Sequence, residues 1–316
     1  MVGASSTTGP PSVTPTPHRR ELNPVRPRAT PYVLVGPATL LLLAFGVLPI
    51  LVAGAVSLTD LDAAGLGDVS RVRGVGLANY AELFGDAAFW QAMRNTAFYV
   101  AVGVPSVVVV SLVIALLLNR SQSRFFRFLR SLYFLPAITG IVAIALVWGY
   151  LYNTQFGLVN YLLSLVGLGP VPWLSSPGLV KVSVALVAIW RGTGLNTVIF
   201  LAALQGVPKE YLEAAALDGA SRLRTTWSVV LPLLRFAILF VTVTTVIAWL
   251  QFFDEAFVLT KGGPLGASTS ISLFLFQQGF AGARFGYASA GSVVLFVVIA
   301  VITVLQLRGR RSDVEY

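Results

Sequence analysis

The residues of this chain that could bind a ligand are polar side chains that interrupt long apolar runs. One group directly follows Trp190 and comprises Arg191, Gly192, Thr193, Asn196 and Thr197. Burying such groups in hydrocarbon is costly, so they are functional candidates by default. Gly192 and Gly194 would let a bound molecule approach the backbone closely. Arg191 has an alternative interpretation, in which its charged end reaches water from the boundary of the apolar run.

A second group of candidates ends another apolar run and comprises Trp249, Gln251, Phe252 and Asp254. Aromatic rings beside hydrogen-bonding groups suit a pyranose, whose ring has apolar faces and a polar rim. Three threonines of the same run have a simpler interpretation, because each could bond to a carbonyl of its own helix. These are Thr242, Thr244 and Thr245.

Residue patterns for catalysis and metal binding are absent from the sequence. It has no cysteine, and therefore no disulfide, thiolate metal site or thiol nucleophile. Its one histidine, His18, lies in a tail rich in Pro and Thr. No phosphate-binding loop of the form G-x-x-x-x-G-K-[ST] occurs, so the chain cannot hold nucleotide phosphates in that way. We predict a non-enzymatic chain with no catalytic residue, no metal site and no cofactor of its own.

The composition predicts an all-α integral membrane protein. Of the 316 residues, 56% are hydrophobic and 11% are charged, whereas soluble domains carry roughly 25% charged residues. So few polar side chains cannot cover a globular surface, and lipid is the expected solvent. A membrane-crossing helix needs about 20 mostly apolar residues. Six runs meet this requirement, at 32–58, 95–118, 132–152, 180–205, 229–250 and 286–307.

The distribution of basic residues predicts the orientation of these six spans. With the N-terminus inside, fifteen of the 22 Lys and Arg residues fall in cytoplasmic segments, as the positive-inside rule requires. Both termini are therefore expected in the cytoplasm of a bacterial cell. The net charge of +9 comes mainly from these anchoring residues, so we expect no nucleic-acid partner. The basic cluster at 18–28 precedes an apolar run too long for a signal peptide.

The remaining segments divide the chain into a central domain and two tails. Residues 1–30 begin with a stretch rich in Ser, Thr, Pro and Gly, which predicts a disordered cytoplasmic tail. Residues 31–308 form the predicted transmembrane domain, and 309–316 form a second cytoplasmic tail. Within 261–283, the sequence KGGP predicts a turn that an interfacial or re-entrant helix follows.

The most charged stretch between two spans is EYLEAAALDGASRLRTTWSVVLPLLR, residues 210–235. Pro208 suits the first turn of a helix. Gly219 can adopt the left-handed conformation that ends this helix, and Ser221 can then cap a second one. The loop at 206–232 is therefore predicted to be two short helices joined by a turn, with a thin alanine surface that a partner could approach.

The spacing within this stretch resembles the EAA signature of binding-protein-dependent ABC transporter permeases. That signature is EAA, three residues, Gly, nine residues, and then Ile-x-Leu-Pro. The corresponding residues here are Glu213, Ala214, Ala215, Gly219, Val229, Leu231 and Pro232. Valine replaces the isoleucine, which is a small apolar change. A match of twenty residues with fixed offsets is specific for this family.

Other segments resemble the carbohydrate-type (CUT1) permeases, particularly their first, MalF-like or UgpA-like subunit. These segments are GLANYAELF at 76–84, RSLYFLPAI at 130–138, WRGTGLNTVIF at 190–200, FDEAFVLTKGGP at 253–264 and FGYASAGSVVLF at 285–296. The resemblance extends from about residue 32 to the end of the chain. It implies six transmembrane helices in the type I ABC importer (MetI-like) fold.

This resemblance implies a permease subunit of an ATP-driven importer for a sugar, expected to be an oligosaccharide. The implied partners are a second homologous permease subunit, two ABC ATPase subunits that bind ATP and Mg, an extracellular substrate-binding protein and membrane lipid. The residues that would couple the chain to an ATPase are Glu213, Ala214, Ala215, Asp218, Gly219, Leu231 and Pro232. The substrate path would include Arg191, Gly192 and Asn196, together with the aromatic and polar candidates Trp249, Gln251 and Asp254.

Two alternatives differ in substrate or in mechanism. An importer of glycerol 3-phosphate or of a glycerophosphodiester would show the same resemblance. An ion-coupled secondary transporter working alone would need inverted repeats and acids buried in mid-span. Every Asp and Glu of this sequence lies in a loop or at the end of a predicted span, which disfavours that second alternative.

Overall fold

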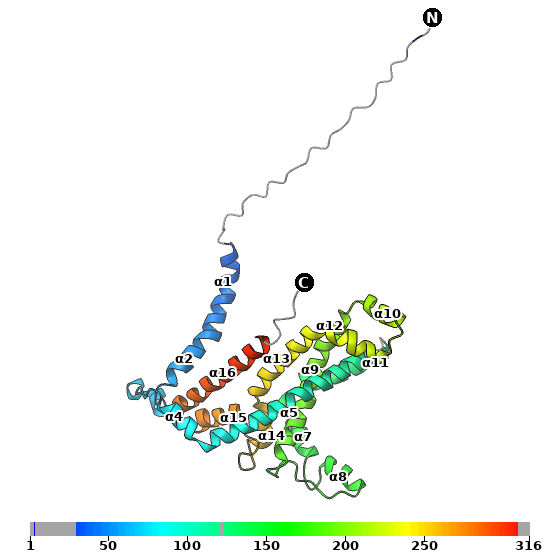
Figure 1. Cartoon of the computed structure of the whole chain (residues 1–316). Helices are drawn as coiled ribbons and strands as arrows, with labels where there is room; N and C mark the ends of the chain where they lie inside the picture. The colour runs from blue at the N-terminus through cyan, green and yellow to red at the C-terminus, as the bar shows by residue number, and fades with distance from the viewer. Residues whose placement is uncertain (1–2, 4–29, 120–122, 309–316) are drawn as a thin grey trace. The chain divides into compact units, whose positions relative to one another are not determined.

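The structure, a computed structural model, describes Gly3 and residues 30–119 and 123–308, which are mostly helical (Figure 1). Among these residues the only strand-like pairing is a single bridge between Thr59 and Gly74. The predicted tails at 1–30 and 309–316 lie outside the described residues, apart from Gly3 and Thr30. The predicted all-α fold is confirmed.

The chain divides into two units, of which the first is Met1–Pro49. Its described helices are α1 (Thr30–Leu42) and the π-helical turn η1 (Leu43–Val47). Together with α2 (Leu48–Val56) they form a continuous apolar stretch of 25 residues, Tyr32–Val56. This length is sufficient to cross a bilayer and agrees with the first predicted span.

The second unit, Ile50–Tyr316, holds the other described helices. The first nine after α2 are α3 (Ala63–Gly67), η2 (Val69–Arg71), α4 (Ala78–Gly85), α5 (Ala87–Leu118), α6 (Arg124–Ile138), α7 (Ile141–Leu151), α8 (Leu158–Leu165), α9 (Val180–Gln205) and α10 (Lys209–Leu217). The rest are α11 (Arg222–Thr225), η3 (Thr226–Val230), α12 (Leu231–Leu233), α13 (Arg235–Leu250), α14 (Asp254–Thr260), α15 (Ile271–Phe276), η4 (Gln277–Ala281) and α16 (Phe285–Arg308).

Two of the six predicted spans are bent rather than straight. Four described stretches are each long and apolar enough to cross a membrane: Tyr32–Val56, α5, α9 and α16. The predicted span 132–152 corresponds to α6 and α7, which meet at 99°. The predicted span 229–250 falls on the arm Arg222–Leu233 and on α13, which meet at 69°. A proline, which removes a helical hydrogen-bond donor, lies shortly before each bend, at Pro136 and Pro232.

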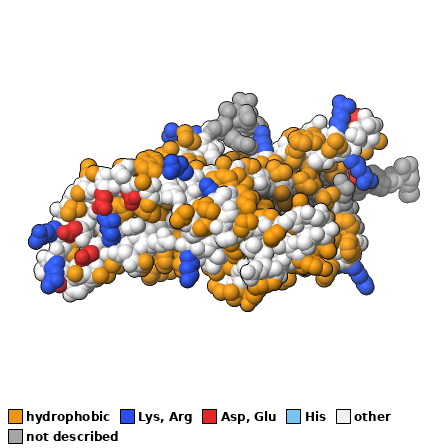
Figure 2. Space-filling model, turned by 90° about the horizontal axis from the view of Figure 1, so that it is seen from below, with side chains coloured by type: hydrophobic (Ala, Val, Ile, Leu, Met, Phe, Trp, Pro, Cys, Tyr) orange, Lys and Arg blue, Asp and Glu red, His pale blue; other side chains and the backbone are white. Residues whose placement is uncertain are grey.

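Helices α5, α9 and α13 form the centre of the second unit, where α5 packs along α9 and against α13. Tyr99, Val107 and Val184 are fully buried between them. Hydrophobic side chains also cover much of the face in Figure 2. Exposed apolar surface on this scale marks a protein that contacts lipid or other apolar partners.

The segment between α14 and α15 begins with a tight turn, as the KGGP sequence predicts. This segment is also anchored on α5. Lys261 and Gly262 have left-handed backbones, with φ of 52° and 88°. The side-chain amide of Asn95 donates to the carbonyl of Gly266 at 3.0 Å and to that of Thr269 at 2.9 Å. These bonds hold the segment between α14 and α15 against α5.

Candidate functional site

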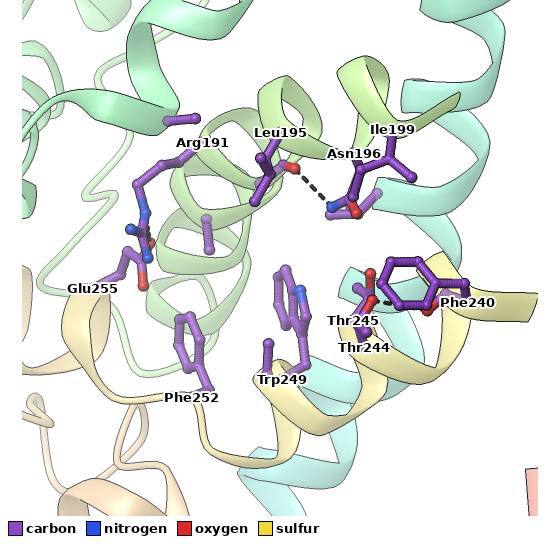
Figure 3. A pocket seen from close by; sticks show the side chains of 15 residues that line it. Arg191, Leu195, Asn196, Ile199, Phe240, Thr244, Thr245, Trp249, Phe252 and Glu255 are labelled. Carbon is purple, nitrogen blue, oxygen red and sulfur yellow. Dashed lines mark hydrogen bonds and ion pairs between the residues drawn. The ribbon is translucent and has the colours of Figure 1, made fainter. Parts of the chain in front are cut away.

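A cavity with a volume of about 450 Å³ lies between α9 and α13 (Figure 3). Its lining residues come mainly from these two helices and from the turn after α13. They are Val107, Ala137, Ala188, Arg191, Gly192, Leu195, Asn196, Ile199, Phe240, Thr244, Thr245, Ala248, Trp249, Phe252 and Glu255. The volume falls within the range of about 300–1,000 Å³ that small-molecule sites occupy.

Helical spacing explains why residues far apart in each helix reach the same cavity. In α9, Gly192, Asn196 and Ile199 are separated by four and three residues, so they share one face. In α13, Thr245 and Trp249 are separated by four residues and share the face that meets α9. Figure 3 shows the side chains of the two helices facing each other across the cavity.

One end of the cavity holds an arginine that is paired with two carboxylates. Arg191 Nε donates to Glu255 Oε1 at 2.7 Å, and Arg191 Nη2 lies 3.6 Å from Asp254 Oδ2. Glu255 is only 1% exposed, whereas the side chain of Asp254 is 51% exposed. Breaking a buried ion pair by removing one partner costs about 3–5 kcal/mol. The pair therefore fixes α14 against α9 and sets the direction of the guanidinium.

The aromatic wall of the cavity is made by Trp249 and Phe252. Their rings stack in parallel, 5.3 Å apart and at an angle of 7°. Phe252 in turn contacts the ring of Tyr99, with the centroids 4.5 Å apart. On α5, a Cβ at Gly103 would overlap the Trp249 ring, so the ring fits only because this residue is glycine. The result is an immobilised apolar wall of which only a small part is accessible, since Trp249 and Phe252 are each 6% exposed.

Thr245 contributes a hydroxyl that lacks a hydrogen-bond partner among the described residues. Its side chain is buried, with 5% exposed. The hydroxyls of Thr242 and Thr244 instead bond to the carbonyls of Ile238 and Phe240, at 2.7 and 2.8 Å, as the helical interpretation predicts. An unsatisfied buried hydroxyl costs about 1–3 kcal/mol. Thr245 lines the cavity, but this oxygen is enclosed, so a ligand there can supply the missing partner only after the side chain rotates.

The structure brings together four of the six residues that sequence reasoning placed on a substrate path. Arg191, Gly192, Asn196 and Trp249 all line the cavity. Gln251 instead lines a separate hollow of about 600 Å³ between α15 and α16. Asp254 does not line the cavity, but it contacts Arg191.

Glycine 194 serves helix packing and does not open α9 to a ligand, so the expectation for this residue is wrong. A Cβ on Gly194 would overlap the backbone carbonyl oxygen of Tyr133, which means that α6 crosses α9 at this point. At Gly192 the nearest side chain, that of Val107, would lie 3.5 Å from a Cβ, which is ordinary contact. Gly192 thus remains the glycine that faces the cavity.

Sequence reasoning missed Glu255 and Gly103 as residues that shape the site. Glu255 is 64 positions away from Arg191, and no sequence spacing predicts that pairing. The available signal was the acidic pair after Phe252-Phe253, of which only Asp254 was chosen. Gly103 lies in a run of small and β-branched residues, so nothing in the sequence distinguishes it.

Most of the predicted coupling residues lie on the α10–α11 segment, away from the cavity, whereas Leu231 and Pro232 lie in α12. Helix α10 carries Glu213, which is exposed, and ends before Gly219, whose φ is +73°. The hydroxyl oxygen of Ser221 accepts a hydrogen bond from the backbone N–H of Arg224 at 3.4 Å, which caps α11. Pro208 occupies the N-cap of α10 and so lies just outside the first turn. The predicted two short helices with a glycine turn are confirmed.

Comparison with known proteins adds the family to this geometry. Residues 95–310 match the family described as binding-protein-dependent transport system inner membrane component. The chain belongs to this permease family. Since the match covers more than half of the chain and several helices could each cross a membrane, it is a multi-pass protein of the cytoplasmic membrane.

Individual permeases resemble the chain over most of its length. It is 33% identical over 286 residues to the lactose transport system permease protein LacF of Rhizobium radiobacter, which covers 89% of this chain and 94% of that relative. It is also 33% identical over 281 residues to the trehalose/maltose transport system permease protein MalF of Thermococcus litoralis, with coverages of 88% and 92%. The resemblance to carbohydrate-type permeases is confirmed.

A solved structure shares the fold of this permease. The chain aligns with a bacterial alginate ABC transporter, crystallised with an alginate pentasaccharide-bound periplasmic protein, with a TM-score of 0.75 and 23% identity. The alignment covers 89% of this chain and 94% of that one. The likeness supports the type I importer fold.

Proposed function

We propose that this chain is the permease subunit of an ATP-driven importer and that a sugar, expected to be an oligosaccharide, passes through the α9–α13 cavity. The observation that carries the proposal is the composition of that cavity. The stacked pair Trp249–Phe252 contributes an apolar wall, while Thr245 and Asn196 contribute polar side chains. This combination matches the two chemical faces of a pyranose. Family relatives named for lactose and for trehalose/maltose support the same substrate class.

The chain would take part in transport without catalysing a reaction. An extracellular binding protein would deliver the sugar, and two ATPase subunits would bind ATP and Mg. Glu213 and the residues around it would contact one ATPase, while a second permease subunit would complete the path. Both termini would lie in the cytoplasm, since this orientation follows from the basic residues. Sugar and ATP would then bias the same pair of conformations from opposite sides of the membrane.

The test of this proposal is ATP hydrolysis by the complete complex in lipid. The chain is purified with its neighbouring permease and ATPase subunits, and the cognate binding protein is added with each member of a sugar and glycerol phosphate panel. Stimulation by one sugar-loaded binding protein is the expected result. A complex without ATPase, or uptake that follows a proton or sodium gradient, would contradict the proposal.

Replacing Thr245 by valine is expected to weaken substrate recognition without destabilising the chain. Valine keeps the shape of the side chain and removes a buried hydroxyl that has no hydrogen-bond partner in the described part of the chain. Losing one hydrogen bond to the sugar costs about 0.5–1.5 kcal/mol, so the KM for sugar uptake should rise about two- to tenfold. Uptake by the reconstituted complex at varied sugar concentration measures this change.

The matched control for that experiment is Thr242→Val on the same helix. The Thr242 hydroxyl bonds to the carbonyl of Ile238, and the residue does not line the cavity. Its KM should therefore stay at the level of the unmodified complex. Equal KM values for Thr245→Val and Thr242→Val would show that the Thr245 hydroxyl does not meet the substrate.

A further inference from the structure

The charged groups around the cavity form a single cluster with more negative than positive charge. Among the described residues that line the cavity, only Arg191 and Glu255 are charged. Asp254 adds a second carboxylate 3.6 Å from the guanidinium. One cation thus faces two anions, and the remaining lining side chains are uncharged.

The arginine is also poorly placed to receive a further anion. Its Nε is already the donor to Glu255, at 2.7 Å, and one of its Nη atoms lies beside Asp254. Arginine recognises phosphate and carboxylate best with two parallel N–H groups directed at one anion. Here the direction of the guanidinium is set by protein carboxylates, of which Glu255 is almost fully buried.

We infer that the cavity accepts uncharged saccharides and rejects anionic ones, and that Glu255 is the residue that sets this selectivity. A phosphorylated or uronic sugar would bring its charge next to a cluster that is already negative, between apolar walls where charges interact more strongly than in water. A neutral sugar meets only partners that suit it: the Trp249 ring, the Asn196 amide and the unpaired Thr245 hydroxyl. The inference rests on the proposed function, and it disfavours glycerol 3-phosphate as a substrate.

The charge of the cavity can be measured without knowing the substrate, because the chain contains no cysteine. Thr244→Cys introduces one thiol at an exposed position that lines the cavity. The complete complex, with cysteine-free partner subunits, is treated with three methanethiosulfonates: trimethylammonioethyl (cationic), sulfonatoethyl (anionic) and hydroxyethyl (neutral). The neutral reagent reports access to the cavity, and the ratio of cationic to anionic rates reports its potential.

A negative potential of about 1 kT should raise the ratio of cationic to anionic rates roughly sevenfold above that of a free thiol in solution. Glu255→Gln keeps the shape and the acceptor for Arg191 while removing one charge, and it should lower the ratio about threefold or more. Asp254→Asn, at an exposed position, should lower it in the same direction and serves if the first variant does not fold. A ratio equal to that of the free thiol, or unchanged by both variants, would overturn the inference.

The matched control is Glu82→Gln, which removes the acid from the exposed Arg284–Glu82 pair. That pair has the same composition as the Arg191–Glu255 pair but does not line the cavity, so the ratio should not change. A change as large as that of Glu255→Gln would mean that the assay reports the net charge of the protein, and the inference would fall.

Protection of the same thiol tests the selectivity itself. Lactose, maltose and trehalose are compared with their 6-phosphates for their ability to slow the neutral reagent. In the unmodified cavity, we expect only the neutral sugars to protect the thiol. In Glu255→Gln, we expect the 6-phosphates to protect it as well. Equal protection by a sugar and by its 6-phosphate in the unmodified cavity would overturn the inference. If no sugar protects the thiol, the proposed function is contradicted, while the measured ratio of cationic to anionic rates remains valid.

Discussion

Glu213→Arg should leave the complex unable to stimulate ATP hydrolysis in response to a loaded binding protein. Glu213 is an exposed acid on α10, and the EAA resemblance places it at the contact with an ATPase subunit. Reversing a charge at a protein interface costs about 2–5 kcal/mol, which corresponds to roughly a thirtyfold or greater loss of affinity. Arginine is a good helix former, so α10 itself should persist.

The readout is sugar-stimulated ATPase activity, together with the amount of ATPase that copurifies with the permease. Glu82→Arg is the control, since Glu82 is also an exposed acid but lies in α4, on the opposite side of the membrane in the predicted topology. That variant should retain nearly full stimulation, because exposed ion pairs contribute only about 0–1 kcal/mol. Normal stimulation in Glu213→Arg would refute the assigned role of α10.

Gly103→Ala is the second substitution with a large expected effect. The added methyl group would overlap the buried Trp249 ring, which is stacked on Phe252 and can yield only toward the cavity that it lines. Overpacking of this kind costs about 1–3 kcal/mol. The thermal midpoint of the purified complex should fall, and sugar uptake should fall with it because the aromatic wall is displaced.

Two further variants separate this collision from a general effect of the substitution. Gly149→Ala changes a glycine of α7 whose Cβ would have nothing within 4 Å, so stability should stay the same or rise. Adding Trp249→Leu to Gly103→Ala should restore stability but not uptake, because leucine vacates the space and removes the stacking surface. If Gly103→Ala is as stable as the unmodified complex, the close approach of α5 and Trp249 is absent.

The coupling segment could be predicted from sequence because its structure is determined locally. Gly219 ends α10 through its own left-handed conformation, and Ser221 caps α11 through its own side chain. Both effects act within four residues, so the relevant spacing is visible in the sequence. The apolar runs were visible for the same reason, since each helix must match the thickness of the bilayer.

The cavity could be predicted only in part because it depends on contacts between distant helices. Asn196 and Trp249 were found because each is a conspicuous side chain in or beside an apolar run. Glu255 became recognisable only when α14 was placed against α9, where its carboxylate meets Arg191. Gly103 acquires its role from the ring of Trp249, which is 146 positions away in the chain.

The two bends could not be predicted because the hydropathy of a segment carries no information about the direction of its helix axis. Residues 132–152 and 229–250 are apolar throughout, so a window of hydropathy treats each as one straight helix. A proline does not by itself indicate a bend, since neighbouring helices can satisfy the carbonyls that it leaves free. A bend needs a local break as well, and this occurs at Thr139-Gly140 in one span and at Leu234 in the other.

Helix α13 has the geometry of a lever. At one end, across the bend at Leu234, it joins the arm that carries Leu231 and Pro232. At the other end it carries Trp249. Sixteen helical residues span about 24 Å, so a tilt of about 10° at the bend moves the far end by about 4 Å. This exceeds the length of a hydrogen bond, so a small push on the arm would be enough to change the contacts that Trp249 makes with a molecule in the cavity.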